Sequence, residues 1–474
     1  MPITETIRIR ILHAAAFLLG ICWARSLFYP EDWPLLQQVH AYWPAVALAL
    51  ELGFRKFGRP LIGGLMLLGM AWGCVRFQSL QAAMNVPGKE VHRAQCLEPL
   101  NQSKMTYLVR IEGLETPLRV RLKHGRLNPG VLFDVNAQQI KPLVCRGHEP
   151  GQFCYARWSL DHGQAFGIYL DSVPPILGTK ELPLLYRCRE AVKRRLSRRT
   201  SLAVRPWALA LVLGDKGQFA EKEIKQIQDF GLMHVLAISG LHIGLFYLCL
   251  SGALRLLPFS LTLMRWGQIV LLVFVWAYAA LCHMVPSVLR ASLFITWSVW
   301  GRFFLRCPTD SQSVWPVALL MQLLIRPQDA FDMGFQLSYM ATAALFYWVP
   351  QAEFRIHGLK MVYITMVCAL LSFPVLIFAY GHFSLGFWVG ALCLAPALVL
   401  VIPVFWIGVF LPPGIWPFED FLMQVFLYFW TRIPAPLLCY WRLTSMSVYE
   451  VWVLQLSLVY FIVWLTKLFS KSNA

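Results

Sequence analysis

Apolar residues in this chain fall into long runs separated by short polar segments. Three runs come first, at about 9–28, 37–54 and 60–80. Nine more follow near 232–257, 264–284, 286–305, 313–326, 330–350, 360–380, 384–411, 418–434 and 448–468. A straight helical membrane span needs about 20 such residues. Several runs are shorter or contain internal Pro or Gly, so we expect about ten spans, some of them broken or re-entrant.

The pattern changes between about Met84 and Val173, where apolar and polar residues alternate over short stretches. The stretches TYLVRIEG, PLRVRLKHG, VLFDVNAQQI and FGIYLDSV are separated by Gly, Pro and Asn. Such alternation is typical of strands with one buried face, so we predict a small antiparallel β domain. About five strands in roughly ninety residues suit a compact β-barrel of the OB type.

These patterns divide the chain into four predicted parts. They are N-terminal membrane helices over 1–82, the β domain over 83–180, a basic amphipathic helix over 181–206 and a second set of membrane helices over 207–470. The loop charges orient them. Arg55, Lys56 and Arg59 should be cytoplasmic and the loop with Glu31 and Asp32 outside, which places the β domain outside the cytoplasm.

Composition supports a membrane protein. Hydrophobic residues make up 58% of 474 residues, charged residues 14%, and the mean hydropathy is +0.56. An ordinary soluble enzyme is excluded, and a polytopic α-helical membrane protein with an inserted β domain is predicted. The net charge of +17 suits anionic lipid head groups, a polyanionic substrate, or both.

The twelve cysteines are scattered without C-x-x-C or zinc-like spacing, so no metal site is expected. Cys96 and Cys145 lie in the β region. If that region faces an oxidising compartment, these two can form a disulfide.

Basic residues gather in the part predicted to lie outside. Arg119 and Arg121 share one strand face, which is either merely solvated or a nucleic-acid surface. Residues 182–205 predict a basic amphipathic helix that either anchors to lipid head groups or draws a phosphate backbone toward the membrane. The candidate DNA-binding residues are Arg110, Arg119, Arg121, Lys123, Arg187, Lys193, Arg194 and Arg198. The candidate stacking aromatics are Tyr107, Phe153, Tyr155 and Trp158.

Four motifs place polar residues inside the apolar runs. They are HVLAISGLHIG with Ser239, Gly240 and His242, PSVLRASLF with Ser287 and Arg290, DMGFQLSYMAT with Asp332, Gln336 and Ser338, and YGHFSLGFWVGALCLAPAL. In the first, Ser239 and His242 share one helix surface, and Gly240 with Gly244 forms a G-x-x-x-G pair suited to close backbone approach. Helix packing, helix capping by Asp332 and snorkelling of Arg290 are the structural alternatives.

HVLAISGLHIG is similar to the signature of the ComEC-type competence proteins, which carry incoming single-stranded DNA across the bacterial inner membrane. S-x-x-R-A and G-F-Q-L-S follow in the family's order. The resemblance implies an OB-like extracytoplasmic domain, a multi-pass inner-membrane channel, and channel roles for the polar residues of the first three motifs. Two departures are Gly390-Ala391, where an Asn-containing turn is common, and Cys282-His283, where Gly is usual.

The resemblance also implies partners. Besides single-stranded DNA and the lipid bilayer, we expect an extracytoplasmic DNA receptor, a cytoplasmic helicase-like ATPase and a separate nuclease. Many family members carry a metallo-β-lactamase-like nuclease domain with an H-x-H-x-D-H signature, which does not occur in this sequence. A nucleotide-binding G-x-x-x-x-G-K-[ST] loop is also missing, so no enzyme activity and no cofactor are expected.

Two other functions fit parts of the pattern. A secondary transporter for a small anion would explain Arg290 and His242 but not an outside β domain with a basic helix. An intramembrane hydrolase would use Ser239 as nucleophile and His242 as base, but a third orienting acid and an oxyanion-hole signature are not evident.

Overall fold

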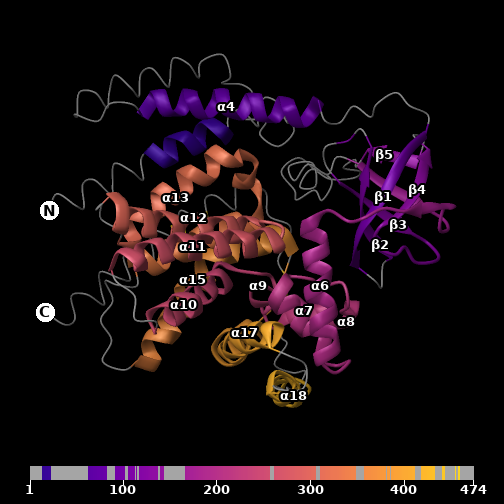
Figure 1. The fold of residues 1–474 in the computed structure, drawn as a ribbon. Helices are drawn as coiled ribbons and strands as arrows, with labels where there is room; N and C mark the ends of the chain where they lie inside the picture. Colours follow the sequence, from indigo (N-terminus) through magenta and orange to yellow (C-terminus); the bar gives the residue numbers. More distant parts are fainter. Residues whose placement is uncertain are drawn as a thin grey trace, which may run out of the picture.

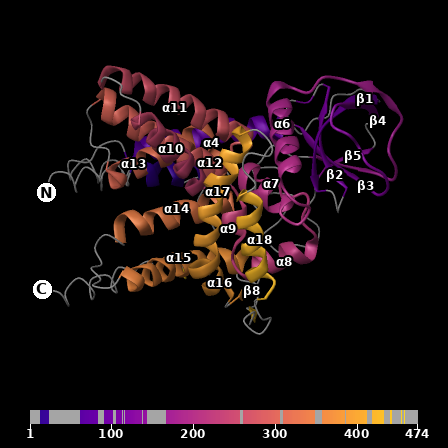
Figure 2. The same ribbon diagram turned by 60° about the horizontal axis from the view of Figure 1, so that its bottom comes forward.

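The computed structural model describes the chain over residues 13–22, 62–82, 91–101, 105–112, 114, 117–136, 139–142, 166–256, 261–305, 310–348, 357–380, 382–384, 386–411, 418–432, 440–442, 454 and 457–458. A β domain lies at one end of the molecule and a body of helices at the other, with α6 between them in both views (Figures 1 and 2). The predicted run 37–54 and the aromatic residues Phe153, Tyr155 and Trp158 lie outside the described residues.

The β domain is one sheet with the strand order β5-β6-β3-β2-β1-β4-β7. The strands are β1 (Val91–Asn101), β2 (Thr106–Ile111), β3 (Leu118–Leu122), β4 (Val131–Asn136), β5 (Ile140–Pro142), β6 (Phe166–Leu170) and β7 (Ile176–Thr179). The four alternating stretches of the sequence coincide with β2, β3, β4 with β5, and β6. The sheet is mixed rather than wholly antiparallel, because β3 and β6 run parallel. The OB-type barrel stays a prediction.

Strand β1 was not predicted because its second half does not alternate. Its sequence VHRAQCLEPLN is buried continuously from Ala94 to Glu98. One side of this stretch packs into the sheet core, while Glu98 on the other side meets the helical body. A strand that is buried on both faces loses the period-two signal.

Cys96 belongs to the core of this sheet. It is a free thiol, and burial together with nearby Glu98 raises its pKa to about 12. The predicted disulfide is therefore corrected, and Cys145 itself lies outside the described residues.

Most of the helices follow the predicted apolar runs. Their bounds are α4 (Ile62–Ala82), α6 (Leu184–Arg199), α7 (Arg205–Leu213), α8 (Glu221–Asp229), α9 (Met233–Leu236), α10 (Gly240–Arg255), α11 (Leu261–Leu281), α12 (Pro286–Trp300), α13 (Ser311–Ile325), α14 (Met333–Ala343), α15 (His357–Tyr380), α16 (Gly386–Val389), α17 (Ala395–Phe410) and α18 (Phe418–Trp430). Helix α6 falls in the predicted basic helix, and α7 and α8 lie outside the predicted runs. Short pieces are η4 (Gly301–Leu305), η5 (Pro327–Phe331), η6 (Ala344–Trp348), η8 (Gly390–Leu394), β8 (His382–Ser384) and β9 (Tyr440–Arg442).

Several helices are irregular, as the internal Pro and Gly predicted. The widened turns η4, η6 and η8 adjoin α12, α14 and α17, and Pro316, Pro374 and Pro403 lie inside helices. Within the described residues, the continuous segment Gly386–Phe410 is long and apolar enough to cross a membrane. Shorter apolar helices include Gly240–Arg255, Trp266–Leu281 and Ser311–Ile325.

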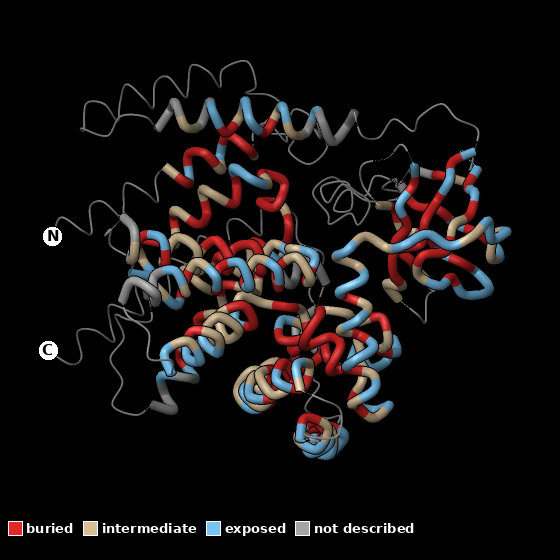
Figure 3. Tube along the Cα trace, in the orientation of Figure 1, coloured by how far each residue is buried: buried red, intermediate tan, exposed pale blue. Residues whose placement is uncertain are grey.

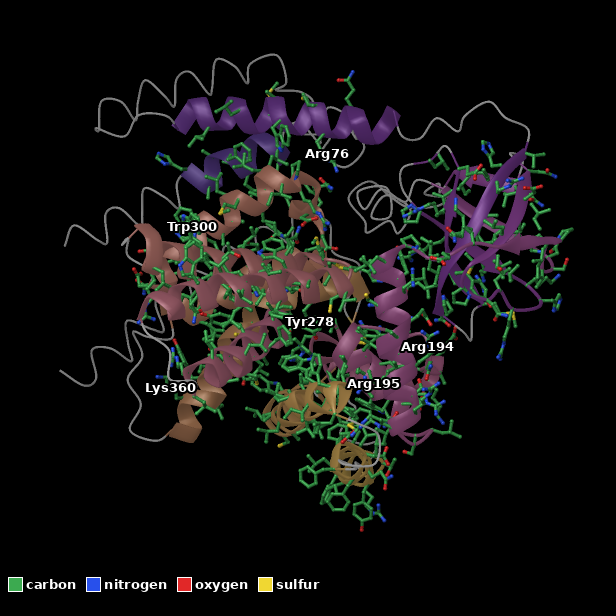
Figure 4. The ribbon with its side chains drawn as sticks, viewed as in Figure 1. Arg76, Arg194, Arg195, Tyr278, Trp300 and Lys360 are labelled. Atoms are coloured by element: carbon green, nitrogen blue, oxygen red, sulfur yellow. The ribbon has the colours of Figure 1, made fainter. Side chains whose placement is uncertain are left out.

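Helix α7 forms the centre of the largest core cluster. Every residue from Trp207 to Leu213 is buried, and α9, α10, α11, α12, α17 and α18 contribute to the same cluster. Figure 3 shows buried residues along α7, with exposed ones on the outer sides of α6 and α18. Tyr278, labelled in Figure 4, joins α11 to this centre by donating a hydrogen bond to the Val212 carbonyl at 2.9 Å.

Candidate functional site

Ser239 and His242 contact each other at the start of α10. Ser239 is the N-cap residue, and its Oγ lies 3.0 Å from Nδ1 of His242. The backbone N–H of Ser239 also donates to Nδ1 at 3.2 Å, so the ring proton resides on Nε2. Nε2 is buried and has no hydrogen-bond partner in the described part of the chain. The predicted pair is thus a helix-capping unit that leaves one buried donor unused.

Gly240 lies against Arg290 of α12. A Cβ added to Gly240 would lie 2.5 Å from Nη2 of Arg290, whereas one added to Gly244 would meet no atom within 4 Å. The predicted close backbone approach through both glycines is therefore wrong. Gly240 instead leaves room for a guanidinium group.

This difference gives a first prediction. Gly240→Ala is expected to displace the Arg290 side chain and to lower the activity of the protein severalfold, because the new methyl group would lie only 2.5 Å from Nη2. Gly244→Ala, in the same helix, adds a methyl group in open space and should behave as wild type. The measurement is the activity proposed below, in strains with equal membrane levels of each variant. Equal activities for both variants would contradict the assignment.

Arg290 is buried, and no counter-charge reaches it among the described residues. Its exposure is 8%, its Nε has no hydrogen-bond partner, and no carboxylate of the described residues lies within ion-pairing distance. The guanidinium carbon lies 5.6 Å from the centre of the Tyr339 ring, which is a cation–π distance. Because the side chain is enclosed by protein, the snorkelling alternative does not hold. Ser287, one turn earlier, donates to the Ile238 carbonyl at 2.9 Å and fastens α12 to the first motif.

In the third motif, Tyr339 rather than the predicted residues reaches this cluster. Asp332 caps α14 by accepting from the Phe335 N–H at 2.9 Å, and the Gln336 amide donates to the Ala330 carbonyl at 3.0 Å. Ser338 is half-buried and accepts a hydrogen bond at its carbonyl from Thr342. These three residues stabilise their own helix, so the capping alternative for Asp332 is confirmed.

The hydroxyl of Tyr339 continues into a buried polar chain. It donates to Oε1 of Gln322 at 3.0 Å, and the Gln322 amide donates to Asp329 at 2.8 Å and to the Pro286 carbonyl at 3.1 Å. Tyr339 directly follows G-F-Q-L-S and lies four residues after Phe335, on the same helix face. This position after the motif is the sequence feature from which Tyr339 could have been identified.

The fourth motif packs against the segment that leads into the first motif. A Cβ on Gly390 would lie 1.8 Å from the carbonyl oxygen of Phe230, the C-cap of α8, four residues before the first motif begins at His234. The first three motifs meet at Arg290, which lies against Gly240 and near Tyr339.

The basic residues of the sheet share a face with an exposed aromatic residue. Leu108 pairs with Arg119, Arg121 pairs with Tyr169 across the parallel strands, and Arg110 lies two residues beyond Leu108. Directly paired residues point to the same side of a sheet. Arg110, Arg121 and Tyr169 are exposed, Arg119 is half-buried, and Lys123 lies exposed just after β3. Tyr107, predicted to stack on DNA, belongs to the core instead. Tyr169 could have been identified from the sequence, because apolar and polar positions alternate in FGIYLD.

Helix α6 has one exposed basic face and one buried charged face. Arg187, Arg194 and Arg198 are exposed, and Arg187 pairs with Glu181 at 3.1 Å. Figure 4 labels Arg194 and Arg195 on this helix. Cys188, on the same helix, is also exposed. On the buried side, Arg199 binds Glu419 at 2.7 Å, so α6 also joins other helices of the body. Its role at a lipid or DNA surface stays a prediction.

The prediction that Lys193 binds DNA is wrong. It is buried and lies 2.7 Å from Asp215, 3.3 Å from Glu98 and 3.5 Å from Glu190. Burial lowers the pKa of Lys193, but the charges of Asp215 and Glu98 outweigh it and raise that pKa overall. A charge engaged in this way is not offered to a phosphate at the surface.

Glu98 of β1 is a buried carboxylate that sequence reasoning missed. Its Oε2 lies 2.9 Å from Nε of Arg189, and its Oε1 lies 2.7 Å from Nε2 of His283. Burial alone would raise the pKa of Glu98, but the contact with His283 and the charges of Arg189 and Lys193 hold it well below its usual range. The partners are 91 or more residues away in sequence, so no local pattern could identify them.

Comparison with known proteins adds three findings. A family model for competence proteins matches residues 211–472. The chain is 29% identical over 180 residues to ComE operon protein 3 of Bacillus subtilis (strain 168), covering 37% of this chain and 22% of that protein. It is 29% identical over 306 residues to the uncharacterized protein YcaI of Escherichia coli (strain K12), covering 60% of this chain and 36% of that protein. The chain thus spans between a fifth and two fifths of these relatives, and no solved structure matches it.

Proposed function

This chain belongs to the competence protein family, and we propose that it carries single-stranded DNA across the inner membrane of a bacterial cell during natural transformation. The observation that carries the proposal is Arg290. It is a buried cation without a carboxylate among the described residues, and it lies where three motifs meet.

A charged side chain buried in a membrane protein costs free energy. An arginine at the centre of a membrane helix costs about 3 kcal/mol or more, and an unpaired buried charge is retained where function requires it. A phosphodiester would supply the missing negative charge, and a guanidinium group binds phosphate with two parallel hydrogen bonds. His242 Nε2 and Arg290 Nε are both buried donors without partners in the described residues, as expected in a passage for an anionic polymer.

The surface of the helical body supports a location in the membrane. Large apolar side chains are exposed on α4, α10, α11, α17 and α18; examples are Leu68 at 61%, Val273 at 64%, Leu400 at 75% and Phe429 at 61%. Water-soluble monomers rarely expose contiguous apolar patches of this kind. The proposal places these residues against lipid tails and the β domain outside the cytoplasm.

The β domain then meets the DNA first. Its face with Arg110, Arg121 and Tyr169 offers phosphate contacts and one stacking platform, and the exposed side of α6 adds Arg194 and Arg198. The proposal further requires a DNA receptor outside the membrane, an ATPase or the membrane potential to pull the strand, and a nuclease to remove the complementary strand.

Deletion of the gene tests the proposal. We expect transformation to fall below detection, while labelled DNA still accumulates outside the inner membrane and no longer reaches the cytoplasm. Complementation by the wild-type gene is the control.

Unchanged transformation in the deletion strain would overturn the proposal. A loss of uptake of a small anion with normal DNA entry would favour the transporter alternative, to which a buried unpaired Arg290 is also suited.

A further inference from the structure

The turn between α11 and α12 has an unfavourable backbone. His283 and Met284 adopt φ angles of 58° and 46°. Left-handed conformations are unfavourable for residues with a Cβ, and two in succession are rare. Such strain persists only where the surroundings hold it in place. The turn leads directly into α12, which carries Arg290 on its second turn, about 6 Å beyond Pro286.

Polar contacts hold this turn from two directions. From the helical body, Arg189 donates to the Leu281 carbonyl, Arg326 to the Met284 carbonyl at 2.8 Å, and Gln322 to the Pro286 carbonyl at 3.1 Å. From the β domain, Glu98 lies 2.7 Å from Nε2 of His283. The β domain thus reaches the strained turn through one side chain.

Loss of Glu98 would affect His283 more than it would affect the other two partners of Glu98. Arg189 also binds the carbonyl of Leu213 at 2.9 Å, and Lys193 also binds Asp215 at 2.7 Å, so both keep partners if Glu98 withdraws. In the described part of the chain, no ion-pair or hydrogen-bond partner other than Glu98 is seen for the His283 ring, which is 33% exposed and also lies 6.1 Å, centre to centre, from the Tyr186 ring. Withdrawal of Glu98 would leave the ring held only by this weaker aromatic contact among the described residues.

We propose that Glu98 is a positioning residue that holds the α11–α12 turn in its strained form and thereby ties the place of Arg290 to the β domain. Displacement of β1, as when the β domain engages a strand of DNA, withdraws Glu98 from His283. The turn then relaxes, and the start of α12 moves with it. The last step rests on the proposed function, whereas the holding role of Glu98 does not.

Hydrogen exchange of the full-length protein in lipid vesicles, without DNA, tests the holding role. Glu98→Gln is expected to raise the exchange rates of the turn amides at His283 and Met284 about tenfold, because it removes the charge from a buried ion pair. Glu190→Gln is the matched control. It removes a carboxylate from the same Lys193 cluster without touching His283, and should leave those amides protected.

A second variant separates this role from general destabilisation. His283→Gln should raise exchange to the same extent as Glu98→Gln, and the double variant should add nothing further, because both act through one contact. DNA uptake should fall in Glu98→Gln and stay normal in Glu190→Gln. Wild-type exchange at the turn in Glu98→Gln, or an equal rise throughout the protein, would overturn the proposal whether or not the chain transports DNA.

Discussion

Replacing Arg290 with alanine is expected to lower DNA entry into the cytoplasm about thirtyfold or more, while the protein remains in the membrane at its normal level. Loss of one partner in a desolvated charge contact costs about 2–5 kcal/mol, which corresponds to this factor. Stability should not fall in parallel, because the substitution removes a buried cation whose carboxylate partner is missing among the described residues. The two readouts are labelled-DNA entry and membrane abundance in the same cells.

Three companion variants sharpen the test. Arg290→Met keeps the packing volume and should fail in the same way, whereas Arg290→Lys keeps the charge without the planar fork and should retain part of the activity. Arg302→Ala removes an exposed arginine from η4, the continuation of α12, and should transform normally. Normal DNA entry in Arg290→Met would remove Arg290 from the translocation path.

Gly390→Ala is expected to have the opposite effect from Arg290→Ala: the amount of protein in the membrane should fall. The added Cβ would lie 1.8 Å from the Phe230 carbonyl oxygen, and neither group is the end of a flexible side chain. Overpacking of this kind costs about 3 kcal/mol or more, a large part of the total stability of a typical domain. Membrane abundance and the melting temperature should both fall, and DNA entry should fall only with them.

Gly252→Ala provides the control for this prediction. Gly252 lies in α10, and a Cβ added there meets no atom within 4 Å. In a helix interior the substitution should be neutral or stabilising by about 0.5–1 kcal/mol. Wild-type abundance of Gly390→Ala would show that the contact between Gly390 and Phe230 is not tightly packed in the membrane.

Much of the element list could be predicted because hydrophobic patterning is local. The runs near 264–284 and 360–380 became α11 and α15, and PLRVRLKHG became β3. The missed strand β1 is instructive. Its residues Ala94 to Glu98 are buried on both sides, one by the sheet and one by the helical body, so the alternation that marks a strand is absent.

Some residues of the candidate site could likewise be predicted from the sequence, and others could not. Arg290 was predicted because an intramembrane cation is costly, a property of one residue in its own run. Tyr339 was passed over in favour of Asp332, Gln336 and Ser338, which bond mainly within their own helix region. Lys193 was assigned to an outer basic surface because its neighbours are basic, yet Glu98 and Asp215 from other segments, together with Glu190 of its own helix, surround it.

What the sequence by itself determined is most of the helices and strands, the family signature and the costly polar residues, since these depend on neighbours a few positions apart. Only the tertiary structure decided which polar groups have partners. Glu98, Arg189 and His283 are separated by 91 residues or more and come together because three elements pack at one point. Whether a charge is neutralised depends on such packing, and that is why Lys193 has carboxylate partners while Arg290 has none among the described residues.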